Sequence, residues 1–353
     1  MTKGKQDIRA LSLAELQALF IARGEKKFRA TQVYEWLWVK SCTQFSEMTN
    51  LSKATRAWLS ADFEIHAVQL SEAQKSNDGT LKNAFQLFDE HVVEGVLIPT
   101  ESRMTACVSS QVGCSLSCSF CATGRLARLR NLNADEIYDQ VVHIKQQAED
   151  HYQKPLSNIV YMGMGEPLLN YRNVLSSIDK ITSAQGLGMS PKRITVSTAG
   201  IAKMIKKLGD DEVRFNLALS LHAANDIKRN AIMPINEQNS LEALADALRY
   251  FYAKTRNKIT YEYIIFKGFN DTLGDASELA DYCKHVPCKV NIIEYNPIDG
   301  GELEQADPEK VDAFAALLER KGITVNIRRS RGKDIDAACG QLANKNTTVQ
   351  NQN

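Results

Sequence analysis

The sequence lacks the features of a protein that enters or crosses a membrane. Its first ten residues, MTKGKQDIRA, contain no apolar segment of the kind found in signal peptides. No run of about 18 apolar residues occurs anywhere in the chain. We therefore expect a cytoplasmic protein that does not contact a membrane.

The chain also lacks an excess of charge of either sign. Its 353 residues carry a formal net charge of +1, so global basicity does not indicate a nucleic-acid partner. The average conceals a local excess, because residues 1–60 contain ten lysines or arginines and five acidic residues, a net charge of +5. This excess suits phosphate binding, and a solvated helix face explains it equally well.

The eight cysteines lack the spacing of a disulfide framework or of a usual zinc site. Disulfides are rare in cytosolic proteins, and a structural zinc site commonly pairs two Cys-x2-4-Cys knuckles. No convincing second knuckle exists, since Cys283 and Cys288 lie far along the chain. The spacing Cys114-x3-Cys118-x2-Cys121 instead predicts one 4Fe–4S cluster with three cysteine ligands, which leaves one iron free to bind a substrate. Zinc binding or simple packing of the cysteines is the alternative.

The predicted elements divide the chain into consecutive segments. A helical module is expected over 1–62, because Ser12-Leu13-Ala14-Glu15 is a capping box and helices follow at 31–40 and from about residue 52. A β-rich extension is expected over 63–102, with strands at 63–68, 81–88 and 92–98. A C-terminal segment, 331–343, precedes a polar tail, 344–353, that we expect to be disordered.

Between residues 103 and 330, strand and helix patterns alternate regularly. Strands are predicted at 105–108, 158–162, 193–197, 214–221, 259–266, 289–294 and 324–328. Helices are predicted at 133–149, 171–184, 200–208, 240–253, 275–285 and 308–321. This alternation indicates the α/β class and a partial barrel of the (βα)6 type, whose functional residues lie at the carboxyl ends of the strands.

Polar residues and glycines follow those strand ends. Gly165 lets a ligand approach the backbone, and the neighbouring Glu166 can take a ligand's ammonium group. Ser197 brings a hydroxyl to a helix N-terminus, which suits a carboxylate. Later strands are followed by Ser220, Leu221, His222 and Asn296. Together with an open iron, these groups predict a site for S-adenosylmethionine, held through its amino and carboxylate groups.

Several longer motifs carry a resemblance to a known family. They are DGT-x-K at 78–82, SSQVGC at 109–114, FCATG at 120–124, RNL at 130–132, GMGEPL at 163–168, STAG at 197–200, SLHA at 220–223 and RGKDIDAACGQL at 331–342. The chain resembles the radical S-adenosylmethionine (radical SAM) superfamily and, more narrowly, the RlmN-type adenosine C2-methyltransferases, from about Leu11 to Leu342. One departure is Ala127, where relatives tend to carry glycine.

The resemblance implies methylation of C2 of adenosine at two places. These are the peptidyl-transferase centre of 23S rRNA and the tRNA adenosine next to the anticodon on its 3′ side. Adenine C2 cannot attack a sulfonium methyl group, so the chemistry requires a radical, which the cluster generates from S-adenosylmethionine. Two S-adenosylmethionine molecules are consumed per methylation, and a flavodoxin or ferredoxin system is the expected electron donor.

The resemblance also assigns roles to residues outside the cluster. Cys339 takes a methyl group, and a second S-adenosylmethionine provides the radical that turns this methyl into a covalent link to C2. Glu94 matches the family's proposed proton acceptor, although on sequence alone it is an outward residue of an alternating strand. Cys107 releases the RNA through a transient disulfide with Cys339. Cys42, Cys283 and Cys288 match no motif, and we expect them to be structural.

The N-terminal module is expected to grip the RNA while the barrel receives the base. Lys26, Lys27 and Arg29 are the predicted phosphate contacts. An enzyme that modifies a ring carbon must take the base out of its stack. We expect a monomer. The nearest alternative is a C8-methyltransferase of the antibiotic-resistance type, and an alternative of another class is a non-catalytic iron–sulfur or zinc RNA-binding protein.

Overall fold

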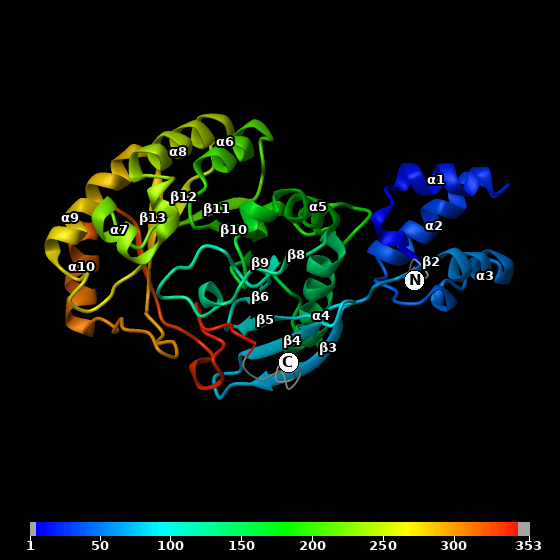
Figure 1. Cartoon of the computed structure of the whole chain (residues 1–353), viewed down its shortest axis with the longest axis horizontal. Coiled ribbons are helices and arrows are strands. Elements are labelled where there is room, and N and C mark those ends of the chain that lie inside the picture. Colours follow the sequence, from blue (N-terminus) through cyan, green and yellow to red (C-terminus); the bar gives the residue numbers. More distant parts are fainter. Residues whose placement is uncertain (1–4, 345–353) are drawn as a thin grey trace.

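The computed structural model describes residues 5–344 of the chain (Figure 1). A helical N-terminal lobe lies beside a larger body that is built on one ten-stranded sheet. The tail that we expect to be disordered, 344–353, falls outside the described residues except for its first residue.

The lobe consists of α1 (Leu13–Ala22), α2 (Lys27–Trp38) and α3 (Lys53–Asp62). The predicted capping box opens α1, because the Ser12 hydroxyl accepts the Glu15 N–H and the Glu15 carboxylate accepts the Ser12 N–H. The second helix begins at Lys27 rather than at residue 31.

The predicted strand at 63–68 is much shorter than the alternation suggested. Only β2 (Phe63–Glu64) forms, in parallel with β1 (Gln6–Asp7), which sequence analysis missed. The ladder ends there because the Asp7 carboxylate accepts the N–H of His66 at 2.9 Å in place of a strand carbonyl. A side chain therefore takes over the pairing that a longer strand would have provided.

Buried contacts join the lobe to α4 (Ala134–Tyr152) of the larger body. Arg9 forms ion pairs with Asp135 at 3.1 Å and with Asp139 at 2.8 Å. The rings of Trp38 and Tyr138 meet edge to face with centroids 5.2 Å apart, and the Tyr138 hydroxyl donates to the Trp38 carbonyl. The lobe and the barrel thus share an apolar and ionic interface.

The central sheet has the strand order β14-β13-β12-β11-β10-β9-β6-β5-β4-β3. Its parallel part is formed by β6 (Met104–Cys107), β9 (Asn158–Tyr161), β10 (Ile194–Thr198), β11 (Asn216–Ser220), β12 (Ile259–Ile264), β13 (Cys288–Ile293) and β14 (Val325–Arg328). The antiparallel strands β5 (Val92–Pro99), β4 (Leu81–Gln86) and β3 (Gln69–Lys75) continue it beyond β6. The edge strands β14 and β3 are unpaired with each other, so the barrel is open, which confirms the predicted partial barrel with a β extension.

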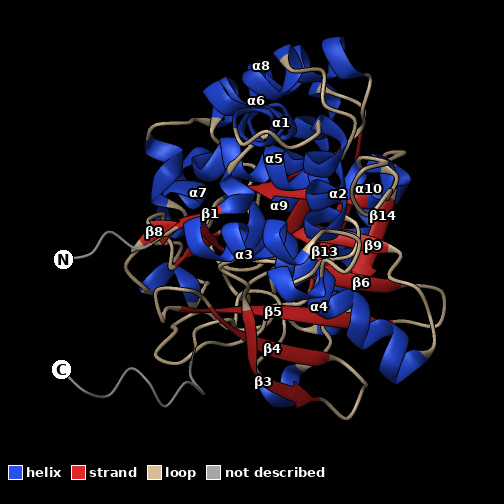
Figure 2. Ribbon diagram, turned by 90° about the vertical axis from the view of Figure 1, so that its right-hand side faces the viewer, coloured by secondary structure: helices blue, strands red, loops and turns tan. Residues whose placement is uncertain are grey.

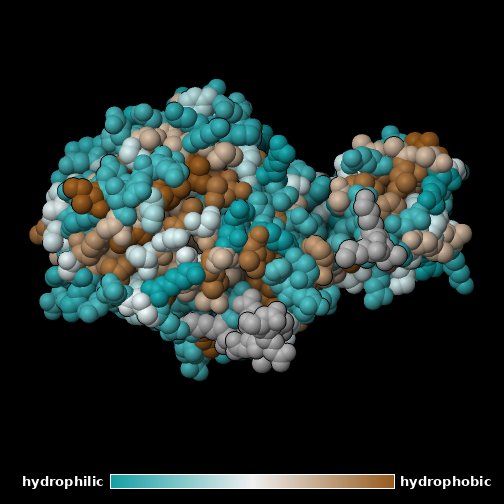
Figure 3. Space-filling view, viewed as in Figure 1, coloured by the Kyte–Doolittle hydropathy of each residue, from teal (hydrophilic) through white to brown (hydrophobic). Residues whose placement is uncertain are grey.

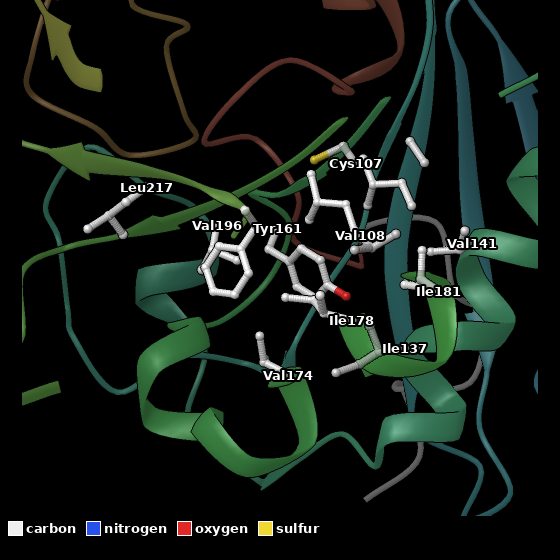
Figure 4. Packing of buried hydrophobic residues seen from close by; sticks show 14 of the residues in the cluster. Cys107, Val108, Ile137, Val141, Tyr161, Val174, Ile178, Ile181, Val196 and Leu217 are labelled. Carbon is white, nitrogen blue, oxygen red and sulfur yellow. The ribbon is translucent and has the colours of Figure 1, made fainter. Parts of the chain in front are cut away.

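Helices cover the outer face of the parallel strands (Figures 1 and 2). They are α5 (Tyr171–Thr182), α6 (Ala202–Asp210), α8 (Leu241–Thr255), α9 (Leu273–Tyr282) and α10 (Pro308–Arg320), with the short α7 (Asp226–Ile232) following β11. In the core, Tyr161 and Val196 of neighbouring strands face Val174 and Ile178 of α5 (Figure 4). The sulfur of Cys107 points away from these α5 residues, toward the other side of the sheet.

Hydrophilic residues dominate the helices on the face shown in Figure 3, and apolar residues gather toward its middle. Among residues 5–344, no helix combines the length and the hydropathy needed to cross a bilayer. The segment after β14 crosses the open side of the barrel and ends beside β4 and β5 (Figure 1).

Candidate active site

A cavity of about 440 Å³ opens at the carboxyl ends of the parallel strands. This volume lies within the range of roughly 300–1,000 Å³ that holds small ligands. The sequence-predicted residues that line it are Cys107, Cys114, Cys118, Cys121, Gly165, Glu166, Ser197, Ser220, His222 and Cys339. The fold therefore brings most of the predicted cluster, cofactor and catalytic residues to one place.

The loop between β7 (Gln111–Val112) and β8 (Arg130–Asn131) carries Cys114, Cys118 and Cys121. We call it the cluster loop. Its start depends on Gly113, whose φ is +74° and where an added Cβ would lie 2.0 Å from the Ala127 carbonyl oxygen. Ala127 itself has no positive φ, so alanine fits this backbone without strain. The departure from the family pattern thus leaves the loop intact.

The thiols of this loop share a buried environment. Burial raises the pKa of Cys114 to about 11, against a hydrogen bond from the Leu116 backbone. Burial likewise raises the pKa of Cys118, and the charges of Cys121 and Cys114 raise it further. Three neighbouring thiolates are unstable alone, so they require a bound cation such as iron to stay deprotonated together.

The three cysteines of this loop line one cavity and do not converge on a single point within the described residues. Among residues 5–344, no three His, Cys, Asp or Glu side chains converge closely enough to hold one metal ion. In a 4Fe–4S cluster each cysteine binds a different iron, so its ligands surround a volume rather than a point. The donor set of Cys114, Cys118 and Cys121 around a common cavity fits that arrangement.

The glycine-rich loop after β9 approaches the cluster loop very closely. Gly165 has a φ of +93°, and a Cβ there would lie 2.4 Å from the Cβ of Gln111. Only glycine fits this position. The Gln111 side chain accepts the N–H of Glu166 at 2.8 Å, which fixes the next residue at the cavity wall.

Glu166 lines the cavity with a buried carboxyl group that already has backbone partners. One oxygen accepts the N–H of Leu168 at 3.0 Å, and the other accepts the N–H of Ala199 at 2.7 Å. Burial raises its pKa, and these hydrogen bonds oppose that shift. Glu166 thus ties the loop after β9 to the end of β10, while its remaining lone pairs stay available to a ligand.

The next strand ends present hydroxyls and an imidazole. The hydroxyl oxygens of Ser197 and Ser220 lie 3.4 Å apart across β10 and β11. Burial and the charge of Arg229 lower the pKa of His222 to about 3, so its ring is neutral. The Nδ1 atom of His222 accepts the Ile264 N–H at 3.1 Å, which places the remaining proton on Nε2.

Two of the predicted cofactor-binding residues lie outside the cavity lining. Leu221 is fully buried and Asn296 nearly so, and neither lines the cavity. The Asn296 amide donates at 3.3 Å to the carbonyl of Cys339 and at 3.3 Å to that of Glu294. Asn296 therefore holds the segment that carries Cys339.

Two hydrogen bonds fasten the Cys339 segment to the cluster loop. The Ala122 N–H donates to the Gly340 carbonyl at 2.7 Å, and the Thr123 hydroxyl donates to the Leu342 carbonyl at 2.6 Å. Cys339 is exposed to the cavity, yet desolvation raises the pKa of its thiol to about 12. Burial also raises the pKa of Cys107 to about 12, with a smaller contribution from the charge of Cys339. Both thiols are free.

Glu94 lies in the middle of β5 and is buried rather than outward-facing. Its carboxylate accepts the N–H of Ala343 at 2.8 Å and of Asn344 at 3.0 Å, and Lys82 lies 3.6 Å away. It is not part of the cavity lining. In this conformation, Glu94 anchors the end of the C-terminal segment.

The predicted phosphate contacts lie at the start of α2, in the lobe (Figure 1). The side chains of Lys26 and Lys27 have no hydrogen-bond or ion-pair partner within residues 5–344. Arg29 is already engaged, because it donates to the side chain of Gln32 at 2.8 Å and to the Asn50 carbonyl at 2.9 Å.

Sequence analysis missed two buried charged residues at the site. Arg229 donates to the carbonyls of Ala199, Ser220 and Leu221, and to the side chain of Asn236, and forms no ion pair with a carboxylate of residues 5–344. It lies in α7, which is too short to show helical periodicity. Glu262 lines the cavity, and one of its oxygens accepts the Asn291 amide while the other has no hydrogen-bond partner in the described chain. Burial raises the pKa of Glu262, and the charge of Arg328 opposes this shift. The alternation of β12 gave no sign of this, because both faces of the strand are buried.

Comparison with known proteins agrees with this site. Residues 6–65 match the family described as the ribosomal RNA large subunit methyltransferase N-terminal domain, and residues 108–280 match the radical SAM superfamily. The chain is 60% identical to the probable dual-specificity RNA methyltransferase RlmN of Christiangramia forsetii, over 97% of each chain. It is 61% identical to the protein of the same name from Cytophaga hutchinsonii, over 97% of this chain and 93% of that one.

A solved structure is similar over nearly the whole chain. The radical SAM methyltransferase from Sphaerobacter thermophilus superposes with a TM-score of 0.90 at 36% identity. The match covers 96% of this chain and 99% of the other.

Proposed function

Because the chain belongs to the RlmN-type family of radical SAM RNA methyltransferases, we propose that it methylates C2 of adenosine in 23S rRNA and in tRNA. The proposed targets are an adenosine of the peptidyl-transferase centre and the adenosine on the 3′ side of the anticodon. The observation that carries this proposal is the shared cavity: Cys107 and Cys339 line the same space as the cluster loop. A radical SAM enzyme without a methyl-carrying cysteine would not need this pair.

The cavity residues fit one 4Fe–4S cluster and S-adenosylmethionine, with two S-adenosylmethionine molecules consumed per methylation. When bound, the cluster supplies the electron that cleaves S-adenosylmethionine and so provides the radical that a non-acidic C–H bond requires. Cys114, Cys118 and Cys121 would hold the cluster. The proposed contacts to S-adenosylmethionine are the lining residues Gly165, Glu166, Ser197, Ser220 and His222. The contacts predicted for Leu221 and Asn296 would require the loops that carry them to move, because neither residue lines the cavity.

Cys339 is proposed to act as the methyl carrier. Its thiolate accepts a methyl group by displacement, and the carbon then becomes bonded to adenine C2. Desolvation and the charges of Cys121 and Glu262 raise the pKa of Cys339, and the charge of Arg328 opposes this shift. The apolar neighbours Ala337 and Ala338 leave room for a flat base beside the sulfur.

Cys107 is proposed to release the product. Attack of its thiolate on the sulfur of Cys339 forms a transient disulfide as the carbon–sulfur bond to RNA breaks, and the released carbon takes the electron pair of that bond and a proton to become the methyl group. Glu94 is proposed as the acceptor of the C2 proton. Because Ala343 and Asn344 hold its carboxylate, this role requires the end of the C-terminal segment to move away from β5.

The lobe, residues 1–62, is proposed to bind the RNA body, with Lys26, Lys27 and Arg29 near the phosphates. The remaining proposed segments are the β extension 63–102, the barrel 103–330 and the carrier segment 331–343. We further propose a cytoplasmic monomer that receives electrons from a flavodoxin or ferredoxin system. Deleting the lobe would expose its interface with Tyr138, so charge variants test RNA binding more cleanly.

Mass spectrometry of the peptide that contains Cys339 tests the methyl-carrier role most directly. Protein purified without oxygen from cells that supply S-adenosylmethionine should carry one additional methyl on Cys339, and Cys339→Ala should lack it. An unmodified cysteine in protein with a complete cluster would contradict the proposal. Cleavage of S-adenosylmethionine should persist in Cys339→Ala, which separates this enzyme from a non-catalytic iron–sulfur or zinc RNA-binding protein.

A further inference from the structure

Glu262 is a buried carboxyl group of the cavity wall with one oxygen that lacks a partner. One oxygen accepts the side-chain amide of Asn291 at 2.8 Å, whereas the other is buried from solvent and forms no hydrogen bond within residues 5–344. The residue is only 3% exposed, yet it lines the cavity. A buried acceptor without a partner carries a free-energy cost that a bound donor removes. The position therefore suits a ligand that brings a hydrogen-bond donor into the cavity.

Neighbouring side chains fix the orientation of this carboxyl group. Glu262 of β12 pairs in register with Asn291 of β13, and the Asn291 side-chain oxygen accepts the Asn326 amide at 3.2 Å. This arrangement leaves the Asn291 amide group facing Glu262, so the same oxygen of Glu262 remains free. Burial raises the pKa of Glu262, and the charges of Arg328 and Lys289 oppose that shift. Both cations favour the carboxylate form, whose oxygens only accept hydrogen bonds.

The carboxyl group of Glu262 shares its part of the cavity with Cys339. Both residues line the cavity, and the charge of Glu262 is one of the causes that raise the pKa of the Cys339 thiol. The proposed cofactor contacts Gly165, Glu166 and Ser197 come instead from the ends of β9 and β10, which β11 separates from β12 in the sheet. Glu262 thus acts on the sulfur that we propose to bond to the RNA base.

The wall beside Glu262 is apolar toward the rim of the barrel. Ile264 ends β12 and Ile293 ends β13, and these two lining residues pair in register. Because alternate residues of a strand share a face, Glu262 lies on the same side of the sheet as Ile264 and roughly 7 Å deeper. A flat base can therefore pack against the isoleucines while a polar group at its edge reaches the carboxylate.

We propose that the free oxygen of Glu262 accepts a hydrogen bond from the exocyclic amino group of the target adenine. This rests on the proposed function. In adenine, C2 and the amino group lie on the same edge of the ring, on either side of N1, so a base that presents C2 to Cys339 brings its donor along the same wall. Enzymes that take a base out of its stack read this edge by hydrogen bonds. Glu262 is thus a specificity-determining residue for adenine.

The test is a competition between two RNA substrates of the holoenzyme. One tRNA transcript carries adenosine on the 3′ side of its anticodon, and the other carries purine riboside there, in which hydrogen replaces the amino group. Mass spectrometry of the methylated products gives the ratio of the two kcat/KM values, which does not depend on how much of a variant is active. Comparing this ratio between proteins cancels the difference in intrinsic reactivity of the two bases.

Glu262→Gln keeps an oxygen for the Asn291 amide and replaces the free oxygen by an amide donor. Its preference for adenosine over purine riboside should be about 10- to 100-fold lower than the parent's, the value of one hydrogen bond to a charged group. Glu262→Asp keeps the charge but draws both oxygens back by one methylene, so its preference should fall between those of the other two proteins. It also serves as the second variant if Glu262→Gln does not assemble the cluster.

Thr260→Val is the matched control. Thr260 lies two residues before Glu262 on the same face of β12 and does not line the cavity. This variant should keep the parent's preference. Iron content and binding of S-adenosylmethionine, measured without RNA for every variant, report cluster assembly and the cofactor site. The second measurement is needed because S-adenosylmethionine carries an adenine amino group of its own.

The outcomes distinguish the role of Glu262 from its alternatives. An unchanged preference in the Glu262 variants, with C2 methylated by the parent, would reduce Glu262 to a structural residue and leave the proposed function standing. Weaker binding of S-adenosylmethionine with an unchanged preference would assign the oxygen to the adenine of the cofactor and would also overturn the proposed contact. A parent that leaves C2 of the adenosine transcript unmodified would overturn the tRNA part of the proposed function and the role of Glu262 with it.

Discussion

The carboxylate of Glu94 accepts the backbone N–H of Ala343 at 2.8 Å. The same carboxylate oxygen also accepts the N–H of Asn344 at 3.0 Å, so β5 holds the end of the segment that carries Cys339. The side chain of Lys82 balances the buried charge from 3.6 Å. The position of the segment that carries Cys339 is therefore coupled to the residue that we propose as the proton acceptor.

Replacing Glu94 should loosen the end of that segment. Glu94→Ala removes two charge-assisted hydrogen bonds worth about 1.5–3 kcal/mol each, whereas Glu94→Gln keeps an acceptor oxygen. Hydrogen exchange of peptides covering 338–344 should accelerate by more than about tenfold in Glu94→Ala and by less in Glu94→Gln. Exchange within β9 serves as the internal reference. Equal protection of 338–344 in all three proteins would show that Glu94 does not anchor the segment.

The order of elements could be predicted because each parallel strand is a short apolar run between amphipathic helices. The predicted strand at 259–266 corresponds to β12, and the helix at 308–321 corresponds to α10. By contrast, β3 was missed because neither of its faces is consistently buried. A strand that is exposed on both faces shows no alternation of apolar and polar residues, so only its pairing with β4 defines β3 as a strand.

The candidate site was predictable where a local motif carries the chemistry, as in the spacing of Cys114, Cys118 and Cys121. Contacts between distant parts of the chain were not predictable. The hydrogen bond from Asn296 to the Cys339 carbonyl joins residues 43 positions apart, and no sequence period reports such a pair. The same limit hid the burial of Glu94, since its partners come from the C-terminal segment.

Removing Cys107 should trap the reaction after RNA becomes attached. Cys107→Ala retains Cys339 and the cluster cysteines, so the covalent link forms but the disulfide that releases RNA cannot. Denaturing gels of anaerobic turnover mixtures should show a protein–RNA band that is absent from Cys107→Ala/Cys339→Ala. Cys283→Ala provides the control for loss of a buried thiol outside the cavity. Only free RNA in the Cys107→Ala reaction would count against the disulfide route.

An ion pair beside the cluster loop should make stability depend on pH. Burial would raise the pKa of Asp89, but hydrogen bonds from Arg130 and His91 hold it at about 2. This group therefore stabilises the fold above its unfolded pKa, near 4, and the stabilisation is lost as the pH falls through 2. Its size is about 2 kcal/mol at pH 7 and about half of that at pH 3.

Urea unfolding of the cluster-free chain measures that difference. Asp89→Asn should be less stable than the parent at pH 7, and the gap should narrow steadily between about pH 5 and pH 3. The control is Asp281→Asn, which removes an exposed pair with Lys284 and should change stability little. A gap that stays constant across this pH range would exclude Asp89 as the titrating group.

Arg229 should be essential for the stability of the loops that follow β10 and β11. Arg229→Met removes the donor for three backbone carbonyls and for Asn236, and each buried acceptor left unpaired costs about 1–3 kcal/mol. The opposing effect is relief of an unpaired buried charge: burial lowers the pKa of Arg229 from 12.5 to about 10, equivalent to about 3 kcal/mol. The free-energy cost of the lost hydrogen bonds is larger than the gain from removing the buried charge.

Arg229→Met should therefore melt several degrees lower than the parent and bind S-adenosylmethionine more weakly, whereas Arg249→Met, at an exposed site, should do neither. A melting temperature equal to the parent's would mean that relief of the buried charge balances the lost hydrogen bonds.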